Sequence, residues 1–528
     1  MDKKSLTTMK RISLLATALL SLGIAYGQNI PTYHNTEIEA SKEYTEGNIY
    51  QRDMLLYTDM LGDTHPYYAN ADHRAKLQKR VHKMYKECGK IEDIAEFKLF
   101  LAKVAATLHD GHTTIYYWSS PDRIFPVRFT INGNTPSIVD LCQEEYSDIL
   151  GKEVKYINGK PLKKILNAAR EIVSADNAVN FENLVTEYLL LTDFWAMLGM
   201  SNEVLNITFA DNTTIAIPAI NKRELKITQL ESNLTNRVTA PRNTLFDYEI
   251  FEEKGICYLQ FNQFADRVTH PQYTQLVRFD EFCNEMMAEI EAKGIKTLVV
   301  DLQYNSGGNS ALGDVLLSWL KPYQEIKQFN TQVRISKLML TYYPYYKEFT
   351  YNGKPLEIGK TYLARKFDHN RVAKIDYTAP QDSTHHILNL DQERLFKGNV
   401  IFIQGKDTFS SAMLLLTTAR DNNIGSIVGE RSGGRPSHYG DVLYCTLPNT
   451  GTITTVSHKI FRRPAYGTVE DAEYLYPDLE IDLNNPRREF VWEFVESFTN
   501  KVNVTKSDKQ QEDDSYLWDT IYNPSMNN

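Results

Sequence analysis

The chain has 528 residues, of which 42% are hydrophobic and 24% charged, a composition typical of a globular protein with roughly two to four domains. Its formal net charge is −9 and it contains no basic stripe, so nucleic-acid binding is not expected. The five cysteines include no C-x-x-C pair, so the sequence predicts neither a disulfide-stapled scaffold nor a cysteine metal site.

Residues 1–27 have the three-part layout of a secretory signal peptide. Its basic residues come first: Lys3, Lys4, Lys10 and Arg11. The apolar run 12–25 follows, and the small residues Ala25 and Gly27 mark a cleavage site before Gln28. Because a membrane-spanning helix needs a longer run of about 20 apolar residues, we expect export and a mature chain without a membrane span. The expected location is the periplasm, the outer surface or the extracellular space.

Residues 28–118 predict an N-terminal helical region. Between residues 48 and 108 apolar residues recur at spacings of three and four, which is the pattern of amphipathic helices. The last of these helices leads into the segment Asp-Gly-His-Thr at 110–113, and a strand pattern follows at 114–118.

Residues 119–240 predict a β-rich domain, with strand patterns at 127–131, 137–141, 153–157 and 205–209. The segment 151–162 reads as a strand, a turn at Asn158-Gly159 and a helix start. It resembles the core of a PDZ domain, which binds peptide C-termini by adding a strand to its sheet edge. An unrelated β-hairpin insert is the alternative.

Residues 241–490 alternate strand and helix patterns, which favours an α/β domain with a parallel sheet and right-handed crossovers. Buried strands are expected at 256–261 and 297–302. The aromatic and polar stretch 321–395 has no clear period and reads as an insertion. A helix is expected at 487–503, and residues 491–528 form the C-terminal helix and polar tail.

Two serines lie where a buried strand turns into a helix. The run Val400–Ile403 predicts the strand, and helical spacing begins at Ser410. A serine at a helix start can attack a carbonyl group while neighbouring N–H groups stabilise the oxyanion. The alternative is that Ser410 and Ser411 simply cap the helix.

A glycine loop is expected beside these serines. If Val299 and Ile401 lie on neighbouring parallel strands, the carboxyl ends of both strands meet at the same sheet edge, where open α/β sheets bind ligands. This places Gly307 and Gly308 next to Ser410. The N–H of Gly307 or Gly308, together with that of Ser411, then forms a candidate oxyanion hole. The alternative is an ordinary turn.

Four short motifs occur in the order found in the carboxy-terminal processing, or tail-specific, serine peptidases. They are the segment at 110–113, the PDZ-like segment at 151–162, D-L-x-x-N-x-G-G at 301–308 and T-x-S-x-A at 408–412. Over residues 48–490 the chain resembles this family, in the branch that includes tricorn core protease. The resemblance implies a crotonase-like catalytic domain over 241–490, with Ser410 as nucleophile and Ser411 as an N–H donor.

The identity of the general base separates two branches of the family. One branch uses a lysine downstream of the serine, and Arg435 stands at that place here. A guanidinium stays protonated in proteins, so Arg435 cannot accept the serine proton. The tricorn-like branch uses a histidine that corresponds to His112, and neutral imidazole suits this role. His438 is the rival base.

The same branch orients its histidine with an acid and a second serine. The serine position corresponds to Gly111, so this part of the relay is altered. The acid is expected shortly before Pro477. Asp471 fits best by spacing, and Glu470 is next. No cofactor and no metal are expected, because H-E-x-x-H, paired-cysteine and phosphate-loop patterns are absent from the sequence.

The leading hypothesis is an exported serine peptidase that hydrolyses peptide bonds of a polypeptide substrate through an acyl-enzyme. The alternative is a catalytically inactive family member that acts as a peptide- or ligand-binding protein. Gly111 in place of serine, Arg435 in place of lysine and Met413 in place of the usual acid favour this alternative.

Overall fold

The computed structural model describes residues 30–116, 123–131, 136–229, 242, 244–270, 275–368, 392–481 and 483. The signal peptide predicted at 1–27 and the helix and tail predicted at 487–503 and 491–528 lie outside these residues. So do residues 369–391 of the predicted insertion.

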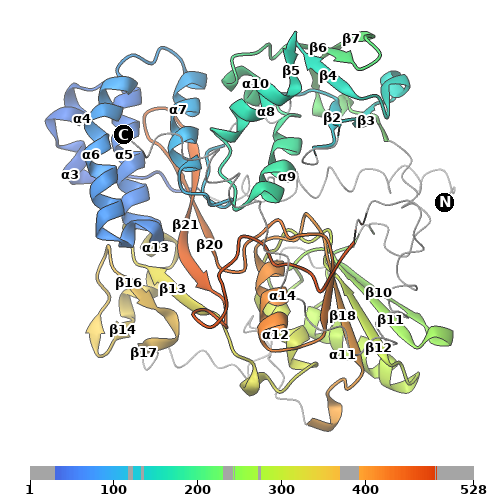
Figure 1. Ribbon diagram of the computed structural model, residues 1–528. Coiled ribbons are helices and arrows are strands. Elements are labelled where there is room, and N and C mark those ends of the chain that lie inside the picture. Colours follow the sequence, from blue (N-terminus) through green and yellow to red (C-terminus); the bar gives the residue numbers. More distant parts are fainter. Residues whose placement is uncertain are drawn as a thin grey trace.

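The N-terminal region is helical, as its spacing predicts, and lies at the left of Figure 1. Its α-helices are α3 (Thr36–Glu39), α4 (Lys42–Glu46), α5 (Ile49–Thr64), α6 (Ala71–Cys88) and α7 (Ile94–Ala106). Asn48 and Gln51 form a reciprocal capping box that satisfies free N–H groups at the start of α5. Helix α7 leads directly into residues 107–116, which carry His112.

The middle region combines short strands with helices (top of Figure 1). Its sheets have the orders β2-β3-β9, β5-β4-β6-β7 and β1-β8. The strands are β1 (Arg123–Ile124), β2 (Val127–Phe129), β3 (Val139–Gln143), β4 (Val154–Ile157), β5 (Lys160–Pro161), β6 (Val204–Phe209), β7 (Thr214–Pro218), β8 (Ile220–Asn221) and β9 (Ile227–Gln229). The helices are α8 (Leu162–Arg170), α9 (Ala178–Tyr188) and α10 (Thr192–Met197). Asn158 and Gly159 have positive φ angles of 49° and 73°, as a tight hairpin turn requires.

A six-stranded sheet of order β10-β11-β12-β18-β19-β22 supports the C-terminal half (right of Figure 1). Its strands are β10 (Phe246–Phe251), β11 (Ile256–Phe261), β12 (Thr297–Asp301), β18 (Asn399–Gln404), β19 (Ser426–Gly429) and β22 (Leu479–Glu480). Only β10 pairs antiparallel among them. Val299 and Ile401 are register partners on adjacent parallel strands, so this prediction is confirmed.

The central strands β11 and β12 are buried along their whole length, and apolar side chains cover both faces of the sheet. Cys257, Leu298 and Phe402 pack on one side with α11 (Phe279–Ala292), α12 (Ala311–Ser318) and α14 (Ser411–Asp421). Alternate residues such as Val299 and Ile401 form a smaller cluster on the other side. This two-residue alternation follows from strand geometry, and the predicted mixed α/β class is confirmed.

A second sheet of order β16-β13-β21-β20 links the N-terminal helices to the C-terminal half. Its strands are β13 (Asn330–Arg334), β16 (Thr361–Leu363), β20 (His438–Thr446) and β21 (Ile453–Arg462). The predicted insertion thus supplies two of these strands, as well as α13 (Lys337–Tyr342) and the small sheet of β14 (Thr350–Tyr351), β15 (Lys354–Pro355) and β17 (Phe367–Asp368). Leu443 and Val456 of the long hairpin share one core with α5 residues such as Leu61.

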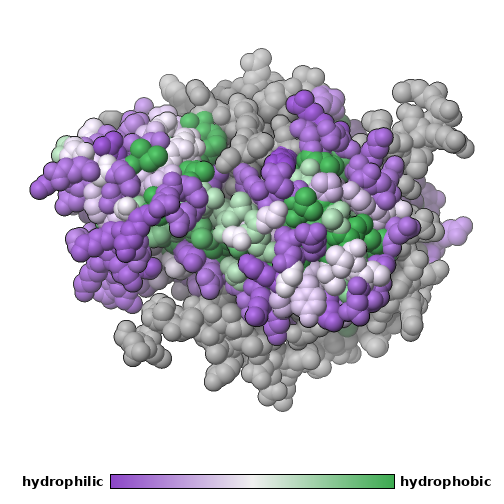
Figure 2. All heavy atoms as spheres, turned by 90° about the horizontal axis from the view of Figure 1, so that it is seen from above, coloured by the Kyte–Doolittle hydropathy of each residue, from purple (hydrophilic) through white to green (hydrophobic). Residues whose placement is uncertain are grey.

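Figure 2 shows one face of the molecule, with hydrophilic residues predominating over the N-terminal helices at the left and hydrophobic patches nearer the middle. Large exposed hydrophobic side chains, such as Ile49, Val277 and Tyr345, lie on different elements. Single exposed apolar residues are common on soluble proteins. Within the described part of the chain, no helix is long and apolar enough to cross a membrane.

Candidate active site

Ser410 occupies a strained position between β18 and α14. Its φ and ψ angles are 53° and −120°, a conformation that costs a non-glycine residue about 1–3 kcal/mol and is typical of functional turns. Ser410 occupies the N-cap position of α14, but its side chain makes no capping hydrogen bond, so the hydroxyl is not used to cap the helix. A sharp strand-to-helix turn of this kind exposes the serine Oγ at the sheet edge.

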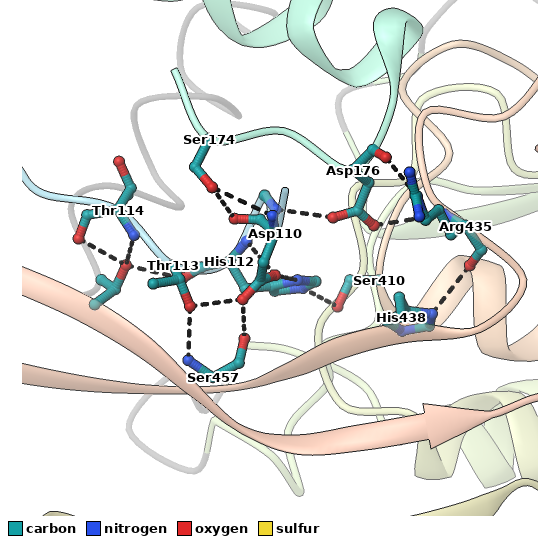
Figure 3. Close-up of polar contacts among 12 residues, drawn as sticks. Asp110, His112, Thr113, Thr114, Ser174, Asp176, Ser410, Arg435, His438 and Ser457 are labelled. Atoms are coloured by element: carbon teal, nitrogen blue, oxygen red, sulfur yellow. Dashed lines mark hydrogen bonds and ion pairs between the residues drawn. The ribbon is translucent and has the colours of Figure 1, made fainter. Parts of the chain in front are cut away.

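His112 faces this serine. Its Nε2 lies 3.0 Å from Ser410 Oγ, although 298 residues separate the two in sequence (Figure 3). The ring is 9% exposed and stacks on Phe409, with ring centroids 4.6 Å apart. The distance and the burial suit proton transfer between the two side chains.

Asp110 lies behind His112. Its Oδ1 accepts the His112 backbone N–H at 2.9 Å, forming a turn in which an aspartate binds the residue two positions ahead. The same oxygen lies 3.4 Å from His112 Nδ1, close enough for an ion pair but not in hydrogen-bond geometry. The carboxylate beside the histidine therefore comes from its own loop.

The acids predicted from the family pattern lie elsewhere. Asp471 Oδ2 pairs with Arg462 Nη1 at 3.5 Å, and no ion pair joins Asp471 to His112. The backbone carbonyl of Glu470 accepts a hydrogen bond from Arg463. We therefore replace Asp471 and Glu470 by Asp110 as the candidate acid.

Donors surround the other oxygen of Asp110 (Figure 3). Oδ2 accepts hydrogen bonds from Thr113 Oγ1 at 2.6 Å and Ser457 Oγ at 2.7 Å, and His65 Nε2 lies 3.1 Å away. Burial alone would raise the pKa of Asp110, but the neighbouring imidazole of His112, and then the hydrogen bond from His65, hold this pKa well below its ordinary value. Asp110 is thus a fully buried carboxylate that stays ionised.

This negative charge acts on His112. Burial by itself would lower the pKa of His112, but Asp110, and then Asp176 and Asp441, outweigh it and raise this pKa above its ordinary value. The nearby carboxyl of Asp176 is harder to ionise than that of Asp110. Burial and the negative charge of Asp110 raise the pKa of Asp176 to about 6.

The glycine loop contacts the serine turn closely. A Cβ on Gly307 would lie 2.7 Å from Ser410 Cβ, and the residue has a φ of 109°, so only glycine fits. The Gly307 N–H donates to Asn305 Oδ1 at 2.8 Å and is therefore occupied.

Two neighbouring N–H groups are available instead. Among the described residues, the N–H groups of Gly308 and Ser411 have no hydrogen-bond acceptor. Ser411 Oγ donates to the Gly308 carbonyl at 2.6 Å, which ties the two segments together. The candidate oxyanion donors are thus Gly308 and Ser411, without Gly307.

His438 lies close to His112, but its hydrogen bond is made to the loop of Arg435 and not to Ser410. The ring centroids are 6.1 Å apart, and His438 Nδ1 lies 3.0 Å from the carbonyl of Arg435, to which it donates. Burial lowers the pKa of His438 to about 3, with the charge of His112 adding to the effect. The ring within hydrogen-bond distance of Ser410 is that of His112.

The structure explains two departures from the family pattern. A Cβ on Gly111 would lie 2.5 Å from Asn180 Oδ1 and 3.0 Å from the Phe409 ring, so a serine does not fit there. Its N–H donates to Asp176 Oδ1 at 2.8 Å. Arg435 is engaged as well, because its Nε donates to the Asp176 carbonyl at 2.5 Å.

Asp110, His112 and Asp176 bring one potential metal-ligand atom each within 4.8 Å of one another. Both carboxylates already accept backbone N–H groups, from His112 and Gly111.

Residues 255–481 match the model of peptidase family S41. This part of the chain is an S41-type peptidase domain. The matched residues include Ser410 and the Gly307-Gly308 loop, whereas His112 and Asp110 precede them. The prediction of a serine-type peptidase of the carboxy-terminal processing family is therefore confirmed. No curated protein matches the chain by sequence.

Solved structures of CPAF share the fold. A structure of mature CPAF complexed with lactacystin aligns with a TM-score of 0.58 and 12% identity, covering 88% of this chain and 99% of that one. A second structure of mature CPAF aligns with a TM-score of 0.55 and 14% identity, covering 92% and 99%. At such identities the likeness concerns the fold alone.

Sequence reasoning missed several residues around the site: His65, Asp110, Ser174, Asp176 and Ser457. Asp110 carried a local signal, because an aspartate two residues before a histidine can fold back on that residue's N–H. The others come from distant segments and carried none. Ser174 Oγ, for example, accepts the Asp110 N–H and donates to the Asp110 carbonyl.

Proposed function

We propose that this S41 peptidase hydrolyses peptide bonds of polypeptide substrates through an acyl-enzyme, with Ser410 as nucleophile and His112 as general base. The observation that carries the proposal is the 3.0 Å contact between Ser410 Oγ and His112 Nε2, beside two N–H groups without acceptors. Nucleophile, base and oxyanion donors are the parts that acyl transfer requires.

The chemistry proceeds in two halves. His112 Nε2 takes the proton of Ser410 Oγ while the oxygen attacks the peptide carbonyl carbon. The N–H groups of Gly308 and Ser411 bind the resulting oxyanion. The imidazolium, held by Asp110, then gives its proton to the leaving amine as the C–N bond breaks. Water, deprotonated by His112, hydrolyses the acyl-Ser410 ester in the second half.

The finer organisation belongs to the same proposal. Residues 241–490 form a crotonase-like peptidase domain, residues 28–118 supply the base, and residues 119–240 form a PDZ-like domain that binds the substrate tail. The histidine-based mechanism is that of the tricorn-like branch. Residues 1–27 direct export, so the peptidase acts in the periplasm, at the outer surface or outside the cell.

A fluorophosphonate probe with a mass-spectrometric readout tests the nucleophile. The probe reacts only with an activated serine, so we expect labelling at Ser410 and its loss in Ser410→Ala. Ser201→Ala, at an exposed turn of the middle region, is the matched control and should label like the wild type. An unlabelled wild-type chain that binds peptide would instead support the inactive binding protein.

A further inference from the structure

His65 lies at the far end of a line of side chains that begins at Ser410. It ends α5, is fully buried, and has its Nε2 3.1 Å from Asp110 Oδ2. The line therefore runs from Ser410 Oγ to His112, across the two oxygens of Asp110, and on to His65.

The proton on His65 is fixed by its other nitrogen. His65 Nδ1 accepts the Tyr67 backbone N–H at 3.1 Å, so Nδ1 carries no proton. The Nε2 then carries it and donates to Asp110. Packing on Tyr439, with ring centroids 4.5 Å apart, keeps the ring from turning. His65 is held as a single tautomer with its donor aimed at the carboxylate.

We infer that His65 is a positioning residue of the peptidase, which orients Asp110 and withdraws charge from it; this inference rests on the proposed function. A donor at Oδ2 fixes the rotation of the carboxylate, so that Oδ1 stays towards His112. It also spreads the negative charge, which limits how strongly Asp110 stabilises the imidazolium. His65 thereby keeps His112 basic enough to accept a proton yet neutral enough to act near pH 7.

Other groups act on the same pair. Thr113 and Ser457 donate to Oδ2 from the loop and from β21. Charged or titratable groups that face His112 are Asp176 before α9, His438 and Asp441 on β20, and Arg435 beside Asp176. His65 adds a ring N–H donor to the same oxygen from the end of α5, on the side of the N-terminal helices.

The test uses the full chain and the rate of fluorophosphonate labelling at Ser410 against pH. His65→Leu should slow labelling about tenfold to a hundredfold, as the loss of an outer hydrogen-bond partner does elsewhere. It should also move the acidic inflexion of the profile up by about half a unit or more, because Asp110 then holds the His112 proton more tightly. His65→Gln keeps a donor at the Nε2 position and should restore most of the rate and the inflexion.

The matched control is His73→Leu. His73 stacks on Tyr67 of the same turn, with centroids 3.9 Å apart, but makes no contact with Asp110, so its loss should leave the profile unchanged. An unshifted inflexion in folded His65→Leu, or equal defects in the leucine and glutamine variants, would overturn the inference.

A second variant and a second measurement cover the case in which His65→Leu is unfolded or inactive. If His65→Leu does not fold, His65→Asn takes its place, because the asparagine side-chain oxygen can accept the Tyr67 N–H in place of Nδ1 and the side chain is too short to reach Asp110. NMR titration of His112 in the same variants needs no activity. A wild-type chain that is not labelled would contradict the proposed function. A His112 titration that is unchanged in the His65 variants would contradict the role of His65.

Discussion

At the scale of single residues, the site depends on how buried charges are paired. Asp110 is fully buried, and its charge is balanced by hydrogen-bond donors and by the imidazole it faces. An unpaired buried carboxylate would be expensive, so each donor contributes to stability as well as to orientation. This pairing makes two substitutions informative.

We expect Asp110→Asn to reduce the labelling rate at Ser410 by about 10²–10⁴-fold, because the imidazolium loses its counter-charge. Asp471→Asn is the matched control. Asp471 is exposed and pairs with Arg462 at the surface, so we expect less than about twofold change. Labelling kinetics on folded variants measure both. A large loss of labelling in Asp471→Asn and a small one in Asp110→Asn would instead identify Asp471 as the acid.

The raised pKa of His112 predicts the pH profile. The base acts only when neutral, so activity should rise with pH, with its inflexion above the ordinary histidine value of about 6.5. The negative charge of Asp176 contributes to this position, so Asp176→Asn should move the inflexion to lower pH. An inflexion below 6 in the wild type would contradict the charge balance described above.

At the scale of elements, two strand-to-helix turns form the site together. β12 and β18 are parallel neighbours, so their carboxyl ends place the Gly307-Gly308 loop against the start of α14. The strain at Ser410 is held by this contact and by the Ser411 hydroxyl on the Gly308 carbonyl. The loop is therefore part of the nucleophile's support.

Gly307→Ala tests this support. The new methyl group meets Ser410 Cβ at 2.7 Å in an unfavourable backbone conformation, so we expect a loss of about 1–3 kcal/mol in stability and at least about tenfold slower labelling. Gly159→Ala is the control, because its φ is also positive but nothing lies within 4 Å of the added methyl. It should lose stability with labelling unchanged. Calorimetry and probe kinetics separate the two effects.

At the scale of the whole molecule, three regions meet at the site. The N-terminal region supplies His112 and Asp110, the middle region supplies Ser174 and Asp176, and the C-terminal half supplies Ser410 (Figure 3). The segment before α9 joins the middle region to the other two. Asn177 Nδ2 donates to the carbonyls of Ser432 and Glu473, at 3.2 and 3.1 Å.

Asn177→Ala should therefore weaken the assembly. One buried and one partly buried carbonyl lose their donor and α9 loses its cap, so we expect about 2–4 kcal/mol of lost stability, measured by thermal or urea unfolding. Asn221→Ala is the control. It removes only an exposed capping hydrogen bond, which the Arg223 N–H donates to Asn221 Oδ1, and should lower the stability by about 1 kcal/mol or less. Equal losses of stability in the two variants would show that the segment before α9 does not stabilise the contact between the regions.

The sequence predicted well where local pattern decides structure. The helices of residues 48–108 and the buried strands follow from apolar spacing alone, because a helix face or a strand buried on both sides needs that spacing. The β20 strand was missed, since Gly440 and Asp441 interrupt its pattern and pairing with β21 supplies the order. The insertion 321–395 was predicted to be irregular for the same reason, because its strand β13 is also ordered by pairing with β21 and not by a local apolar pattern.

The family of this protein, its serine turn and the glycine loop were thus determined by the sequence itself, because each rests on residues close together in the chain. Which acid faces His112, and which glycine N–H is free, were decided only by the tertiary structure. A carboxylate becomes a partner through its distance from Nδ1, and an N–H becomes available when nothing accepts it. Asp110 meets the first condition and Gly308 the second through contacts with distant segments.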